Sequence, residues 1–139
     1  MTIAALITWV LAATMGAFLL TTFVVNGGLQ SGTEGRSSRF APPLILGHAG
    51  LAATGLAIWI WYLISGAKAL PWVCLGVLAC VAALGLTMFG FWFAAGNLSR
   101  GRHSHKPRHA AEDKFPPPAV FVHGLFAVTT VVLVLLTAL

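Results

Sequence analysis

The chain has 139 residues, of which 58% are hydrophobic and only 8% charged, with a formal net charge of +5 and a mean hydropathy of +0.91. A soluble domain of this size cannot bury so much apolar surface, which excludes an ordinary soluble globular protein and makes lipid the expected solvent. The positive charge is explained by membrane topology and anionic lipid, so we expect no nucleic-acid partner.

Four uncharged apolar runs are long enough to cross a bilayer, which takes roughly 20 residues of helix. They cover residues 3–25, 42–65, 69–96 and 117–139. Backbone groups in lipid must be paired internally, so helices are the expected form. The first run lacks the basic flank and cleavage site of a secretory signal, and we expect it to be retained. The prediction is a single all-α integral membrane domain with four transmembrane helices.

Basic residues are concentrated in two of the three connecting segments. Residues 26–41 and 97–116 carry seven Lys or Arg residues, whereas the short segment between the second and third runs carries only Lys68. The positive-inside rule therefore places these two segments in the cytoplasm and both termini outside, and we expect a bacterial plasma membrane. Amphipathic rings prefer the membrane interface, so we expect five of them near the outer one: Trp9, Trp59, Trp61, Tyr62 and Trp72.

The second and fourth runs begin with the same short motif. Arg39-Phe40-Ala41-Pro42-Pro43 and the following residues to His48 align without a gap on Lys114-Phe115-Pro116-Pro117-Pro118 and the following residues to His123. Proline suits the first turn of a helix, so these motifs mark two helix starts. The match predicts a duplicated helical hairpin, helices 1–2 and 3–4, although helices 1 and 3 show only weak similarity.

His48 and His123 are the only Asp, Glu, Lys, Arg or His residues inside the four runs. Ionisable residues in a membrane usually face the bundle interior and have a partner. Both lie about 10 Å into parallel helices, at 1.5 Å per residue, and small residues such as Gly47, Gly50 and Gly124 flank them. We therefore expect one haem b between helices 2 and 4, with its iron bound by Nε2 of both histidines.

A haem between the second and fourth helices would also involve the groups around the two histidines. Each Nδ1–H is expected to donate to a carbonyl one turn earlier, at Leu44 or Ala119. Arg39 and Lys114 are expected to face the haem propionates. Two alternatives stay open: neutral histidines that hydrogen-bond across the bundle and hold helices 2 and 4 together, and separate chlorophyll-type magnesium ligands.

The segment 97–116 holds a second histidine cluster, His103, His105 and His109, which could bind Zn, Cu or Ni, with Glu112 and Asp113 close by. The neighbouring basic residues disfavour a cation and favour docking on lipid or on another subunit of a redox complex. These basic residues are Arg100, Arg102, Lys106 and Arg108. The sequence shows no paired carboxylates, nucleophile triad or phosphate loop, so we predict no catalytic residues.

Four spans with one histidine on each of two helices resemble the small membrane cytochrome b anchors, which pass electrons between a peripheral enzyme and quinone. The resemblance implies an electron-transfer subunit that exchanges electrons with quinone or with a partner oxidoreductase. The alternative function is a cofactor-free accessory subunit of a larger membrane complex.

Overall fold

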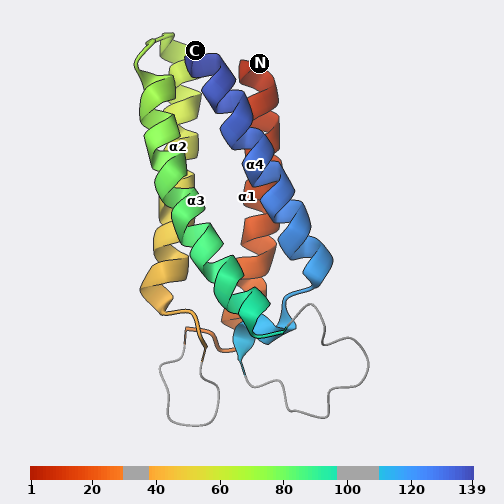
Figure 1. Ribbon diagram of the computed structural model, residues 1–139. Helices are drawn as coiled ribbons and strands as arrows, with labels where there is room; N and C mark the ends of the chain where they lie inside the picture. The colour runs from red at the N-terminus through yellow and green to blue at the C-terminus, as the bar shows by residue number, and fades with distance from the viewer. Residues whose placement is uncertain (30–37, 97–109) are drawn as a thin grey trace.

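The computed structural model describes residues 1–29, 38–96 and 110–139, which contain helices and no strand. Figure 1 shows a bundle of four helices with both chain ends at the same end of the bundle. In chain order the elements are α1 (Thr2–Val25), α2 (Pro42–Ser65), α3 (Leu70–Ala94), the short 3-10 helix η1 (Ala111–Lys114) and α4 (Pro117–Ala138).

The four-helix prediction is confirmed. Each helix is long and apolar enough to cross a membrane. The predicted ends agree with the observed ends to within two residues; the largest difference is at α3, which stops at Ala94. The chain turns there because Gly96 adopts a left-handed conformation with φ 72°, which a residue without Cβ adopts readily.

Prolines set the starts of the two histidine-bearing helices, as the sequence motif predicts. α2 begins at Pro42 and α4 at Pro117, each with proline in its first turn. A proline has no backbone N–H, and the first N–H groups of a helix have no partner within the helix, so nothing is lost there. α2 ends at Ser65 and is followed by Gly66, whose left-handed backbone turns the chain into the short connection to α3.

The helices pack most extensively as two antiparallel pairs, α1 with α4 and α2 with α3. In Figure 1 these pairs lie side by side along the bundle. Each pair therefore combines one helix from the first half of the chain with one from the second half. The pairing of α2 with α3 agrees with the short connection between them, as predicted.

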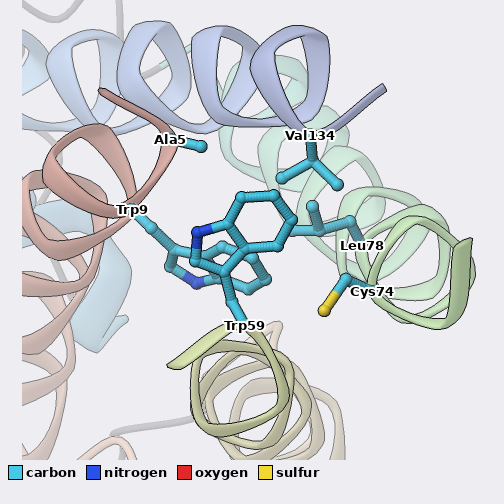
Figure 2. Packing of buried hydrophobic residues seen from close by; sticks show 6 residues of the cluster. All are labelled: Ala5, Trp9, Trp59, Cys74, Leu78 and Val134. Atoms are coloured by element: carbon cyan, nitrogen blue, oxygen red, sulfur yellow. The ribbon is translucent and has the colours of Figure 1, made fainter. Parts of the chain in front are cut away.

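The core near the chain termini is built around two tryptophans. Trp59 is fully buried and Trp9 is 3% exposed, and their ring centres lie 6.4 Å apart. Figure 2 shows Trp59 projecting from α2 between the other three helices, towards Val134 and Leu78. Gly55 makes this packing possible, because a Cβ there would lie 2.8 Å from the Trp9 ring.

This core corrects one sequence expectation. Trp9 and Trp59 belong to the interior of the bundle and are not interfacial anchors. By contrast, Trp61 and Trp72 are 60% and 52% exposed, as residues that face lipid or the interface must be. All four lie in apolar runs, and only the packing of the helices separates buried rings from exposed ones.

Candidate functional site

His48 and His123 meet inside the bundle. Their ring centres are 6.1 Å apart, and the ring planes are inclined by 65°. Both residues are partly buried, between the tryptophan core described above and a second apolar cluster that contains Phe23, Phe40 and Phe115. The prediction that the two imidazoles approach each other from α2 and α4 is therefore confirmed.

Each imidazole is held by a backbone carbonyl of a neighbouring helix. His48 Nδ1 lies 3.0 Å from the carbonyl oxygen of Val81 on α3, and His123 Nδ1 lies 2.9 Å from that of Ala12 on α1. A carbonyl oxygen only accepts hydrogen bonds, so Nδ1 carries the hydrogen and donates it. In the neutral ring Nε2 is then an unprotonated nitrogen with a free lone pair.

The observed partners differ from the predicted ones. The expectation that Nδ1–H donates to Leu44 or Ala119, on the histidine's own helix, is wrong. Each ring instead reaches across to the helix against which its own helix packs most closely. The resulting hydrogen bonds connect α2 with α3 and α4 with α1, and not α2 with α4.

Glycines explain why these two carbonyls are accessible. Gly85 follows Val81 by four residues, and Gly16 follows Ala12 by four. A helical side chain leans towards the preceding turn, so a larger residue at these positions would cover the carbonyl. A Cβ at Gly85 would lie 3.0 Å from His48 Cε1, and one at Gly16 would lie 3.1 Å from His123 Cε1.

The two halves of the site are built alike. Each consists of a histidine on one helix and, on the neighbouring helix, a carbonyl with a glycine one turn later. The carbonyls of Ala12 and Val81, like Gly16 and Gly85, are 69 positions apart in the chain. The buried residues of α1 and α3 follow the same spacing: Ala5 and Cys74, Trp9 and Leu78, Ala12 and Val81, Phe23 and Trp92.

The histidines themselves are 75 positions apart, because the connection from α3 to α4 is six residues longer than that from α1 to α2. The similarity of α1 and α3 is therefore found at a spacing of 69 residues and is missed at the spacing of 75 that relates the histidines. The shared pattern covers burial and hydrogen bonding, and the duplication of the hairpin stays a prediction.

Arg39 lies at the end of the bundle opposite the chain termini and is ion-paired there. Its guanidinium Nη1 is 2.9 Å from Asp113 Oδ1 and 3.5 Å from Glu112 Oε1. The hydrogen bond to Asp113 raises the pKa of Arg39 above its ordinary value. Lys114, its counterpart in the sequence motif, is exposed. The predicted contact of Arg39 and Lys114 with haem propionates stays a prediction.

Glu112 joins the segments that precede α2 and α4. Its side chain is fully buried. Oε1 accepts the backbone N–H of Arg39 at 2.7 Å, and Oε2 accepts the Ser38 hydroxyl at 2.9 Å. We call these contacts of Ser38 and Arg39 with Glu112 and Asp113 the polar clamp. The carboxylates are thus used in holding two chain segments together, a role that the sequence did not indicate.

Several predicted site residues lie outside the described part of the chain. They are the cluster His103, His105 and His109 and the basic residues Arg100, Arg102, Lys106 and Arg108. Within residues 1–29, 38–96 and 110–139, no three His, Cys, Asp or Glu side chains are grouped to hold a metal ion. In the described helices His48 and His123 are therefore a pair and not part of a larger group of such side chains.

The spacing of the pair can be compared with that of two imidazoles that share one metal atom. Metal–imidazole bonds are about 2 Å long, so a metal bound by Nε2 of two opposed rings separates the ring centres by about 6 Å. The observed separation is 6.1 Å. The Nδ1–H···O=C hydrogen bonds are also the usual support of a ligating imidazole, because they fix the tautomer and the ring orientation.

Comparison of the chain with protein-family models, with curated proteins and with solved structures gave no significant match.

Proposed function

We propose that this membrane protein is an electron-transfer subunit that holds one haem b between His48 and His123. The observation that carries the proposal is the paired geometry: two imidazoles with centres 6.1 Å apart, each donating from Nδ1 to a carbonyl. This arrangement leaves both Nε2 atoms available as ligands.

The small number of protein ligands favours haem over a bare metal ion. Zinc and copper sites in proteins need three or four protein ligands, whereas the described helices supply two imidazoles without a third ligating group beside them. A tetrapyrrole brings four nitrogens of its own, so the imidazoles of His48 and His123 would be sufficient to hold its iron.

The number of ligands that the iron would have also favours electron transfer over catalysis. Haem iron supplies one-electron chemistry when bound. Both His48 and His123 would be used in holding the iron, so the proposed site would leave a substrate no place to bind to it. The chain's residues would then hold the iron, exclude water with the surrounding apolar side chains, and keep both imidazoles in place during a change of redox state.

The purified protein's visible spectrum tests the proposal. After expression with haem available and reduction with dithionite, we expect a b-type α band and about one haem per chain. An edge-on contact between two imidazoles without a metal has a similar centre distance. A fully folded protein that shows no haem spectrum would therefore overturn the proposal and favour the cofactor-free accessory subunit.

The orientation in the membrane follows from charge. Seven of the eight Lys and Arg residues lie in the segments 26–41 and 97–116, so we propose that these segments are cytoplasmic and both termini outside, in a bacterial plasma membrane. Residues 97–116 would then be the surface that docks on the redox partner, either another subunit or an enzyme that uses quinone. A C-terminal alkaline phosphatase fusion should be active, and an inactive but stable fusion would reverse the orientation.

A further inference from the structure

We infer that Gly16 and Gly85 are positioning residues that set the tautomer and the orientation of the two ligating imidazoles. The role of these glycines in haem binding rests on the proposed function. The contacts between the glycines and the histidines are present in the protein without haem. Neither glycine touches the iron site directly in the proposal. Each acts through the histidine that lies against it.

The carbonyl that accepts the hydrogen bond of His48 is shared with the backbone of α3. The Val81 carbonyl already accepts the backbone N–H of Gly85 within α3, since that is the regular α-helical pairing. A carbonyl oxygen has a second lone pair, and His48 Nδ1 reaches it at 3.0 Å. This second bond requires an approach from the side of the helix, which is where the side chain of the residue four positions later would lie.

Each glycine also leaves the space that the ring of its histidine occupies. A Cβ at Gly85 would meet His48 Cε1 at 3.0 Å and Nδ1 at 3.5 Å, and a Cβ at Gly16 would meet His123 Cε1 at 3.1 Å and Nδ1 at 3.5 Å. Separations of 3.0 to 3.1 Å are tighter than ordinary contact, so the ring must move by a few tenths of an ångström. Such a movement lengthens the Nδ1–H···O bond and turns Nε2 away from its position.

Other glycines of the bundle do not have this relationship. A Cβ at Gly76 or Gly90, both on α3, would meet nothing within 4 Å beyond the adjoining part of its own helix. Gly76 and Gly90 provide matched controls on the same helix as Gly85.

The test uses two readouts on the full chain in detergent. The first is the ¹⁵N spectrum of labelled histidine in haem-free protein, which reports which ring nitrogen carries the hydrogen. We expect both membrane histidines as Nδ1–H tautomers, with Gly85→Ala changing only the His48 signals and Gly16→Ala only those of His123. Gly76→Ala and Gly90→Ala should change neither. Alanine favours helix over glycine by about 1 kcal/mol, so these variants should fold.

The second readout is titration of haem-free protein with hemin. Loss of a supporting contact to a ligating histidine typically weakens metal binding by about 10-fold or more, so we expect that loss for Gly16→Ala and Gly85→Ala and none for the controls. Nε2–H tautomers in the wild-type protein, or signals and binding in the glycine variants equal to those of the controls, would overturn the inference. Failure of every form to bind hemin would instead overturn the proposed function, while the tautomer spectra still decide the role of the glycines.

Discussion

The two halves of the bundle agree at the histidines and differ away from them. On both sides a histidine donates to a carbonyl that is followed four residues later by glycine. Other positions that are 75 residues apart, like the two histidines, hold different residues: Trp59 corresponds to Val134, and Arg39 to Lys114. The comparison indicates that both halves share the hydrogen bonds of the imidazoles and the positions of the buried residues of α1 and α3. They differ in the side chains that fill the core and in the ion pairs of Arg39.

The largest expected effect comes from the position where the halves agree. His48→Ala and His123→Ala should each abolish the b-type spectrum, because either substitution would remove one of the two residues that hold the iron in the proposed site. Visible spectra of the reduced, purified variants measure this. A spectrum that survives one substitution but not the other would break the equivalence of the two halves.

The next effect concerns the tryptophan core, where the halves differ. Trp59→Ala removes a fully buried ring that lies between the other three helices, and we expect a loss of about 3 kcal/mol of stability. Val134→Ala removes only two methyl groups from the same cluster, so we expect about 1 kcal/mol. Lipid is as apolar as the core, which means that lost packing and not transfer from water sets both values.

Denaturation of both variants in detergent, followed by helical circular dichroism, compares the two losses. Trp61→Ala is the control, because that ring is 60% exposed and its removal should leave the midpoint nearly unchanged. Equal losses for Trp59 and Val134 would mean that the two halves carry the core equally, contrary to the observed packing.

A smaller effect is expected at the polar clamp. Arg39→Gln removes the guanidinium that is ion-paired with the buried carboxylates of Glu112 and Asp113. The arginine side chain is 39% exposed, so solvent screening reduces the loss, and we expect about 1–2 kcal/mol. Lys114→Gln should leave the unfolding midpoint unchanged, because that side chain is exposed. A midpoint lowered equally by both substitutions would show that overall charge, and not the clamp, determines stability at this end.

The sequence alone predicts the positions of the helices and the approach of the two histidines. Uncharged runs bounded by prolines or polar segments fix where helices can lie in lipid, and α2 and α4 start at the expected prolines. Two histidines at equal depth on parallel helices were expected to face each other, and they do. These features depend on residue type and spacing along the chain, which a single sequence contains.

The hydrogen-bond partners of the two histidines could not be predicted from residue type and spacing. The partners of His48 and His123 are backbone atoms of other helices, and any residue type has a carbonyl. One signal was present: Gly16 and Gly85 are 69 residues apart, but the histidine motif suggested a comparison at 75. The clamp between Arg39 and Glu112 joins residues 73 positions apart, and only the folded chain shows that they meet.

The polar clamp has a consequence for the length of the connecting segments. Ser38 lies four residues before the start of α2, and Glu112 lies five before the start of α4. Sliding either helix by one residue would displace its imidazole by about 1.5 Å and rotate it by about 100°. Because the entry points of the two helices are bonded directly to each other, insertions and deletions between α1 and Ser38, or between α3 and η1, need not misalign the rings. A variant with residues inserted in either connection should therefore keep the relative position of the two imidazoles.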